Sequence, residues 1–234
     1  MPFALSLDDL GARYQLDPLA IKRLTELATL LVDDELAPTT VREPTLVRND
    51  HLADALVALE LPEVRAAQRV ADLGSGAGIP GLPLAIAMPA AHFTLIDSVS
   101  RKCEFMRSAA ERLALENVTV LHERAETWKA GLGNCDLVTV RAVAALDIIE
   151  EYAAPLLQMG GHLLAWRGKR EPQVEQEGRR AAELLGLVER EPIHVEPYRQ
   201  AQHRHLHLYQ KLAETPDRFP RRDGVARKKP LGRS

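Results

Sequence analysis

Residues 70–81 read Val70-Ala71-Asp72-Leu73-Gly74-Ser75-Gly76-Ala77-Gly78-Ile79-Pro80-Gly81. This run is a short apolar segment that ends in an acid and enters a glycine-rich turn. Glycine tolerates positive φ and lets a ligand approach the backbone closely. Pro80 suits the first turn of a helix, where its missing N–H costs nothing. Strand, glycine turn and helix in this order are typical of the nucleotide-binding corner of an open α/β sheet.

The glycines fit two cofactor patterns. Residues 76–81 match the dinucleotide fingerprint Gly-x-Gly-x-x-Gly, and Asp97 follows about 20 residues later, where an acid would hold a ribose hydroxyl. Residues 74–78, preceded by Asp72, instead fit S-adenosylmethionine (SAM), which carries a cationic amino group and a sulfonium. A pyrophosphate prefers bare helix N-terminal amides, and a carboxylate there would repel it. Asp72 therefore favours SAM, and a tight turn without a ligand remains the alternative.

Strand-like and helix-like segments alternate after residue 69. We expect helices from Pro80, over 100–115, over 146–158 (ended by Gly160-Gly161) and over 172–185. The expected strands are 69–73, 92–96, 118–121, 137–140, 162–166, 188–195 and 205–209. The alternation predicts the α/β class with a doubly wound, Rossmann-like, mostly parallel sheet. The last two strands lack a helix between them, which predicts an antiparallel final strand.

In the N-terminal part the apolar residues recur at helical spacing, and no strand is expected there. Asp17-Pro18 predicts the start of a helix over 17–36, and a looser helix is expected over 7–14. A connector over 37–44 is followed by Asp50, which we expect to cap a helix through about residue 59. The prediction is therefore a helical extension (1–62), a SAM-binding domain (63–215) and a basic C-terminal tail (216–234).

Composition excludes several classes of protein. The chain has 234 residues and 46% hydrophobic residues, enough for one α/β core with an appendage. Its 4% aromatic content argues against a base-stacking platform. Charges interrupt each long apolar run, and the N-terminus lacks the basic region of a signal peptide, so we expect a cytoplasmic protein without a membrane segment. Cys103 and Cys135 are expected to be reduced thiols.

Charge is unevenly distributed along the chain. The net charge is −3, but from Arg218 onward seven basic residues face only Asp223, so the tail carries +6 and the rest −9. A basic tail on an acidic body predicts contact with phosphates, and a disordered solubilising tail is the alternative.

Several segments together resemble one family: the bacterial 16S rRNA guanine-N7 methyltransferase, also called glucose-inhibited division protein B. The similarity extends over most of the chain. The Gly-x-Pro-Gly-x-Pro run and the Pro-Arg-Arg…Lys-Lys-Pro-Leu tail are its most specific parts. The segments that carry it are 72–85, 95–98 with Arg101, Lys102 and Phe105, 124–126, 136–142 and 219–231.

The resemblance implies a class I SAM methyltransferase that methylates N7 of a guanosine in 16S rRNA, either free or within the small ribosomal subunit. It implies SAM as the cofactor, no metal, and no need for an oligomer. Guanine N7 has a lone pair and no proton, so no general base has to be found in the sequence. The alternating His203, His205 and His207 are accordingly interpreted as a polar strand surface.

Carried over to this sequence, the family's pattern assigns six site residues. Gly74 and Ile79 would line the SAM pocket, Asp97 would accept the ribose hydroxyls, and Ala125-Glu126 would border the adenine. Arg141, just after an expected strand, would lie beside SAM and the target base as the catalytic residue. The alternatives are a helix-capping acid at Asp97, a solvated helix start at Glu126 and a surface ion pair at Arg141.

The chain departs from the family's pattern at three places. An Asn-Leu-Thr motif is replaced by Ala37-Pro38-Thr39-Thr40, an Arg-His pair by Asp50-His51, and a Lys-Gly by Arg167-Gly168. These changes leave three other functions open: a SAM methyltransferase with another RNA, protein or small-molecule acceptor, a nicotinamide-dependent oxidoreductase, and a non-catalytic SAM- or RNA-binding module.

Overall fold

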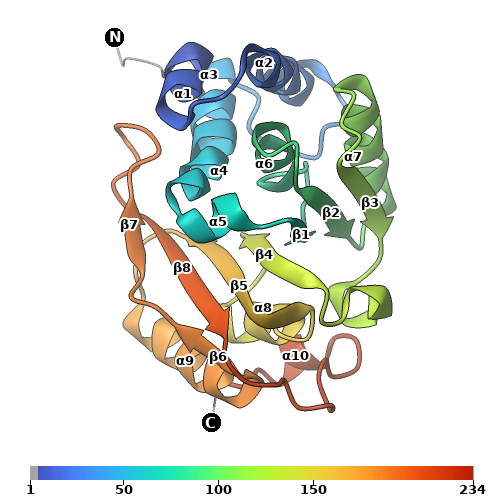
Figure 1. Cartoon of the computed structure of the whole chain (residues 1–234), viewed down its shortest axis with the longest axis vertical. Coiled ribbons are helices and arrows are strands. Elements are labelled where there is room, and N and C mark those ends of the chain that lie inside the picture. The colour runs from blue at the N-terminus through green and yellow to red at the C-terminus, as the bar shows by residue number, and fades with distance from the viewer. Residues whose placement is uncertain (1–4, 234) are drawn as a thin grey trace.

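One eight-stranded sheet organises the protein (Figure 1). The computed structural model describes residues 5–233. The strands are β1 (Arg69–Leu73), β2 (His92–Asp97), β3 (Val118–His122), β4 (Cys135–Arg141), β5 (Leu157–Arg167), β6 (Leu187–Glu189), β7 (Ile193–Val195) and β8 (Arg204–Lys211). Their order is β3-β2-β1-β4-β5-β8-β6, and β7 also pairs with β8. Strands β1–β5 run parallel and β8 is antiparallel to β5, which confirms the predicted fold class.

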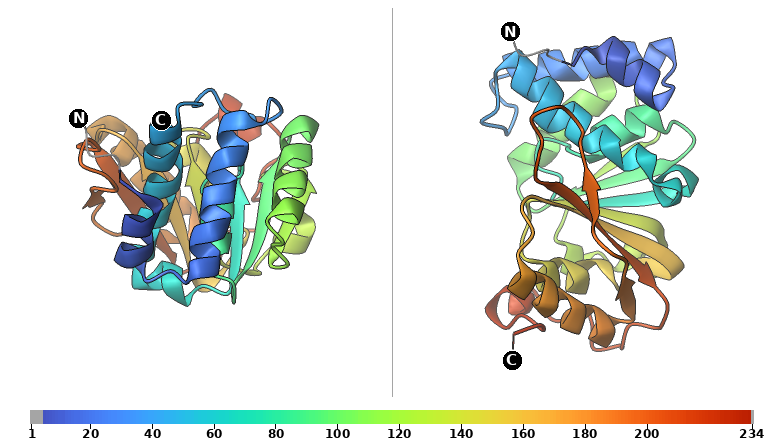
Figure 2. Two further views of the ribbon diagram at one scale, coloured as in Figure 1. Left: turned by 90° about the horizontal axis from the view of Figure 1, so that it is seen from above. Right: turned by 90° about the vertical axis from the view of Figure 1, so that its left-hand side faces the viewer.

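Helices cover both faces of the sheet (Figure 2). The α-helices are α1 (Leu7–Tyr14), α2 (Pro18–Asp33), α3 (Pro44–Leu46), α4 (Asp54–Leu56), α5 (Pro62–Ala66), α6 (Gly81–Ala87), α7 (Ser100–Arg112), α8 (Leu146–Ala153), α9 (Pro172–Leu185) and α10 (Val225–Lys228). The N-terminal helices, α6 and α7 lie on one face, and α8 and α9 lie on the other. Two apolar clusters fill the space between the sheet and these two layers.

The N-terminal helices follow from local sequence signals. Ser6 and Asp9 form a capping box at α1, and Asp17 accepts a hydrogen bond from the N–H of Ala20 at the start of α2. Both predicted helices are therefore confirmed, although α2 ends at Asp33. The prediction for Asp50 is wrong, because this residue lies inside a π-helical turn, η1 (Val47–Ala53), that joins α3 to α4. π-Helical turns are often found at functional sites.

Two further predictions of secondary structure are wrong. The helix expected over 146–158 ends at Ala153, and Gly160 and Gly161 lie within β5. A Cβ on Gly161 would lie 2.9 Å from the main-chain oxygen of Cys135, and the β4–β5 register shifts between Cys135 and Leu137. The two glycines therefore permit a β-bulge rather than ending a helix. The strand expected over 188–195 is two short strands, β6 and β7, which pair with different parts of β8.

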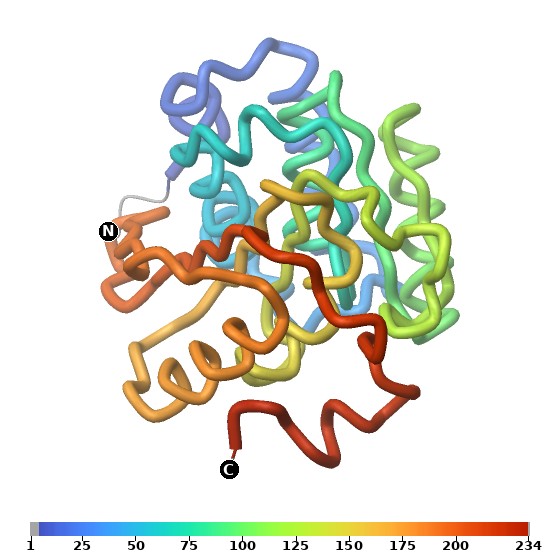
Figure 3. The backbone as a smooth tube through the Cα atoms, turned by 60° about the horizontal axis from the view of Figure 1, so that its bottom comes forward, coloured from blue at the N-terminus to red at the C-terminus, as the bar shows by residue number. Residues whose placement is uncertain are grey.

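The C-terminal segment, residues 216–233, packs against α8 and α9 (Figure 3). Phe219 and Ala226 are buried in the second apolar cluster. Arg221 forms a bidentate ion pair with Glu151, whose side chain is 1% exposed. The disordered tail that was considered as an alternative is therefore not found for these residues. The limits proposed for the three parts of the chain remain a prediction.

The cysteines, the histidines and the helices bear on the predictions about thiols, a metal site and a membrane segment. Cys103 and Cys135 are free and buried, as expected. His207 is buried and bonded to Glu189, and residues 5–233 contain no group of three or more side chains suited to a metal ion. Within the same range, each helix is too short or too polar to cross a membrane.

Candidate active site

A cavity of about 250 Å³ opens at the carboxyl ends of β1, β2 and β4. In the strand order, β1 lies between β2 and β4, so the topological switch point of the sheet is here. Ligands of doubly wound sheets bind at this point. Four of the six predicted site residues line the cavity: Gly74, Asp97, Ala125 and Glu126. We call it the first cavity.

The glycine turn is shaped by close contacts. Gly74 has a φ of +67°, and a Cβ there would lie 2.6 Å from Cγ2 of Val143. Gly78 has a φ of +79°, and its Cβ would lie 2.3 Å from Cδ1 of Leu82. A larger residue at either position would be strained and would collide with a neighbour. The backbone of the turn, without intervening side chains, can therefore form one wall of the first cavity.

Asp72 lies beneath the turn and does not line the cavity. Its carboxylate is fully buried and accepts hydrogen bonds from the N–H of Gly81 at 3.1 Å and from Oγ1 of Thr139 at 2.8 Å. Burial raises the pKa of this carboxyl to about 6. Its place before the glycines predicts a partner for the cationic end of SAM, but Asp72 does not line the cavity and its hydrogen bonds stabilise the turn instead.

Asp97 connects the glycine turn to the next helix. One carboxylate oxygen accepts from the N–H of Gly76 at 3.0 Å, and the other accepts from the N–H of Val99 at 3.0 Å. Nζ of Lys102 lies 3.5 Å from the oxygen that accepts from Gly76. Each carboxylate oxygen can accept a second hydrogen bond. The predicted alternative, a capping acid before α7, is therefore compatible with a role in the cavity.

The C-terminal segment forms part of the cavity rim. Ala125 and Glu126 lie on a 3₁₀ turn, η3 (Ala125–Thr127), and the N–H of Gly224 donates to Glu126 at 3.5 Å. Arg227 lines the cavity and donates to the main-chain oxygen of Val143 at 3.3 Å. Arg227 is not among the residues predicted from the sequence, because the net charge of the tail does not indicate which of its arginines lines the first cavity.

Ile79 and Arg141 do not line the first cavity. Ile79 is buried in the apolar cluster on the α6 face of the sheet. Arg141 lines a second cavity of about 440 Å³, and Ala142 borders both cavities. Ala142 has a φ of +56°, which is uncommon for a residue with a side chain. On either side of it, Val143 contacts the glycine turn and Arg141 enters the second cavity.

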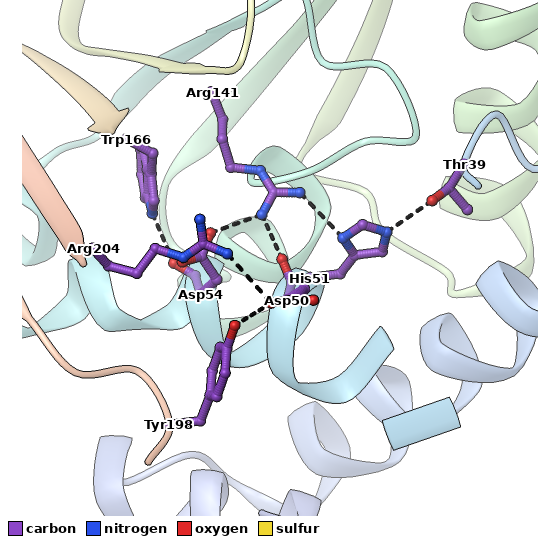
Figure 4. Close-up of polar contacts among 8 residues, drawn as sticks. All are labelled: Thr39, Asp50, His51, Asp54, Arg141, Trp166, Tyr198 and Arg204. Atoms are coloured by element: carbon purple, nitrogen blue, oxygen red, sulfur yellow. Dashed lines mark hydrogen bonds and ion pairs between the residues drawn. The ribbon is translucent and has the colours of Figure 1, made fainter. Parts of the chain in front are cut away.

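Arg141 is held by three acceptors (Figure 4). Its Nη1 donates to the main-chain oxygen of Asp50 at 2.6 Å and to Oδ2 of Asp54 at 2.8 Å. Its Nη2 lies 3.2 Å from Nδ1 of His51. The side chains of Arg141 and Asp54 are 18% and 4% exposed, so this ion pair is largely shielded from water. The surface ion pair considered as an alternative is therefore found, but in a buried setting.

His51 links Arg141 to the connector after α2. Burial, with Arg141 beside it, lowers the pKa of His51 to about 4, so the ring is neutral at pH 7. A guanidinium can only donate, so Nδ1 must be the acceptor and Nε2 carries the proton. Nε2 lies 2.9 Å from Oγ1 of Thr39, which therefore accepts this hydrogen bond.

Arg204 also lines the second cavity, and Tyr198 supports it from behind Asp50. Tyr198 donates its hydroxyl proton to Oδ1 of Asp50, and Nη2 of Arg204 lies 3.3 Å from the same oxygen. Nε of Arg204 lies 3.3 Å from Oδ1 of Asp54. Sequence analysis missed Tyr198 and Arg204, because nothing in the sequence indicates that they approach a turn some 150 residues earlier.

The departures from the family's pattern gather around this cavity. Thr39 reaches it through His51, whereas Asp50 and His51 line it directly. Arg167 and Gly168 line its rim. Differences that are scattered along the sequence therefore fall on one surface, next to the first cavity.

Comparison with known proteins gives one family. Residues 22–206 match the family model described as rRNA small subunit methyltransferase G. A protein of that name from Rubrobacter xylanophilus is 38% identical over 98% of this chain and 90% of its own length. Among solved structures, a SAM-dependent methyltransferase from Aquifex aeolicus has a TM-score of 0.57 at 17% identity, over 81% of this chain and 98% of its own. Fibrillarin from Aeropyrum pernix, solved with natively bound SAM, has a TM-score of 0.51 at 16% identity, over 68% of this chain and 72% of its own. The chain belongs to the rRNA small subunit methyltransferase G family, also named GidB.

Proposed function

We propose that this chain transfers the methyl group of SAM to N7 of a guanosine in the 16S rRNA of the small ribosomal subunit. Membership of the family makes it a SAM-dependent methyltransferase. The observation that carries the finer proposal is the pair of cavities that meet at Ala142. The first cavity would hold the cofactor and the second would receive the base.

The residues of the first cavity fit SAM. Gly74 presents bare backbone, where a side chain would collide with Val143. Oδ1 of Asp97 has acceptor capacity left for a ribose hydroxyl, and Ala125 and Glu126 would border the adenine. Ile79 supports the turn from the core side rather than the cavity. The dinucleotide alternative is not favoured, because the chain belongs to a family of SAM-dependent methyltransferases.

Arg141 and His51 of the second cavity are not placed to act as general bases, which agrees with a reaction that needs none. When bound, SAM supplies a methyl group that its sulfonium makes electrophilic. The guanidinium of Arg141 can only donate hydrogen bonds. His51 has one ring nitrogen occupied by Arg141 and the other by Thr39. The chain's own contribution is therefore to orient the base and to shield the site from water.

The substrate is proposed to be RNA whose target base leaves its stack to enter the second cavity. Arg167 lies at the rim of this cavity and can meet phosphates. The ribosomal substrate would place the protein in the cytoplasm, and one copy of the chain holds both cavities. Because the departures from the family's pattern surround the second cavity, a different acceptor is the second candidate.

The test is transfer of labelled methyl from SAM to small subunits purified from cells that lack this protein. Digestion and mass spectrometry would identify the modified nucleoside. We expect one 7-methylguanosine in each 16S rRNA. Small subunits from cells that contain the protein are the matched control and should accept no further methyl. If SAM binds but neither sample is labelled, the acceptor is different and the proposal fails.

A further inference from the structure

We propose that the carboxylate of Asp50 recognises the target guanine by accepting hydrogen bonds from its N1–H and N2–H groups. This inference rests on the proposed function, since it assigns the second cavity to the base. It adds a residue that selects the base.

Asp50 is the accessible acid of the second cavity. Its side chain is 30% exposed, whereas that of Asp54 is 4% exposed. One oxygen of Asp50 is held by the hydroxyl of Tyr198 and faces Arg204, so the carboxylate has a fixed orientation. Its backbone is fixed as well, because its main-chain oxygen accepts from Arg141. A carboxylate held at one oxygen and open to a cavity can accept from a ligand with the other.

Asp54 explains why the cavity tolerates a second acid. It receives Arg141 on Oδ2, and its main-chain oxygen accepts from Nε1 of Trp166 at 2.7 Å. Its Oδ1 is buried and lies 3.3 Å from Nε of Arg204, with which it forms an ion pair. Buried carboxylate oxygens are rarely left without a donor. Both oxygens of Asp54 therefore face arginines, which leaves Asp50 as the acid of this pair that can accept from a ligand.

The hydrogen-bonding pattern of guanine fits this wall. Its Watson–Crick edge presents two neighbouring donors, N1–H and N2–H, which match a carboxylate that can only accept. Adenine presents an acceptor at N1, which would repel the same carboxylate. A site built to hydrogen-bond a group on its substrate rejects the analogue that lacks the group. Asp50 would therefore select guanine over adenine and inosine.

The same contact favours the reaction. The N7–CH₃ bond forms as the S–CH₃ bond breaks, the electron pair of the broken bond stays on sulfur, and no proton is transferred. The positive charge moves from the sulfonium to the purine. A carboxylate on the Watson–Crick edge interacts more strongly with the cationic purine than with the neutral one, which stabilises the transition state.

The experiment uses the full chain and small subunits reconstituted from 16S transcripts in which a small fraction of guanosine is replaced by inosine. Inosine keeps N7 and N1–H but lacks the N2 amino group. Mass spectrometry gives the ratio of 7-methylinosine to 7-methylguanosine, corrected for the inosine content. For the unaltered chain we expect at least about tenfold discrimination against inosine, the size of one charge-assisted hydrogen bond.

The variant Asp50→Asn should reduce that discrimination to about threefold or less and lower kcat at saturating SAM, because the charge is lost. Glu196→Gln, a change of the same type at an exposed residue, should behave like the unaltered chain. Asp50→Ser serves as a second variant if the first does not fold. Full discrimination in the Asp50 variants, or none in the unaltered chain, would overturn the inference. Absence of any 7-methylated product from the unaltered chain would instead refute the proposed function.

Discussion

At the scale of single residues, the site depends on how tightly one arginine is held. Arg141 donates to the main-chain oxygen of Asp50, to the carboxylate of Asp54 and to His51. These three acceptors come from consecutive turns of the η1–α4 segment. A planar guanidinium can satisfy them together, whereas an ammonium group acts as a point charge.

We therefore expect Arg141→Lys to lower kcat for methyl transfer by at least about tenfold, since the loss of even one charge-assisted hydrogen bond is worth about 1.5–3 kcal/mol. Steady-state kinetics with small subunits would measure it. The control is Arg190→Lys, the same change at an exposed ion pair with Glu63. A variant at Arg141 with unaltered kcat would exclude this residue from the catalytic site.

His51 should make the stability of the protein depend on pH. Its pKa is about 4 in the folded chain and 6.5 in the unfolded chain, so the unfolded state binds more protons between these values. Stability should therefore fall as pH decreases from 6.5 towards 4, by about 3 kcal/mol in total, and be unaffected by His51 above pH 7.

Urea unfolding at several pH values, compared with His51→Asn, would measure this effect. The variant cannot titrate, so the difference between the two stability curves should grow as pH rises from 4 to 6.5 and then remain constant. Parallel curves over the whole range would show that His51 is not held in its neutral form.

Asp97 should contribute to cofactor affinity. We expect Asp97→Asn to weaken SAM binding by about 10- to 100-fold, because hydrogen bonds to a charged group are worth about 1.5–3 kcal/mol. Titration calorimetry would give Kd. The control is Glu104→Gln, at an exposed acid on the neighbouring helix α7. A Kd within twofold of the unaltered value would leave Asp97 with only its structural contacts to Gly76 and Val99.

Sequence reasoning reached some of these residues and missed others for a physical reason. Gly74 follows β1 directly and Asp97 ends β2, and the carboxyl ends of neighbouring parallel strands meet at one edge, so their proximity was predictable. Tyr198 and Arg204 act on Asp50 through the tertiary fold alone. Local pattern does not indicate which distant loop will cover a cavity.

At the scale of elements, the C-terminal segment differs most from its prediction. It was expected to contact phosphates through its positive charge. Three of its arginines instead face the body of the protein: Arg221 pairs with Glu151, Arg233 lies 3.5 Å from Asp147, and Arg227 lines the first cavity. Composition gives the charge of a segment, but the acids that pair with these arginines lie more than 50 residues earlier in the sequence.

Breaking the Arg221–Glu151 pair should therefore destabilise the fold. We expect Glu151→Gln to cost about 3 kcal/mol, because removal of one partner of a buried pair leaves the other uncompensated. The double variant with Arg221→Gln should cost less than the sum of the two single changes. Urea unfolding would measure the cycle. If the two costs simply add, the segment is not anchored by this pair.

At the scale of the whole molecule, the N-terminal helices and the α/β sheet share their core and their site. Leu24 and Leu56 belong to the same apolar cluster as Phe93 of β2. The second cavity takes Asp50 from one part and Arg204 from the other. Residues 1–62 were predicted as an extension, and their apolar spacing did predict a buried helical face, but not which face of the sheet it would cover.

This sharing predicts that the protein unfolds as one unit. Calorimetry of the full chain should give a single transition whose calorimetric and van't Hoff enthalpies agree. A chain of residues 63–234 would expose the apolar cluster that α2 and α4 cover, so we expect it to aggregate or to unfold without a cooperative transition. A folded, SAM-binding 63–234 chain, or two transitions in the full chain, would show that the N-terminal helices are an independent layer. The second cavity would then form only when that layer docks, and acceptor binding should depend on docking while SAM binding should not.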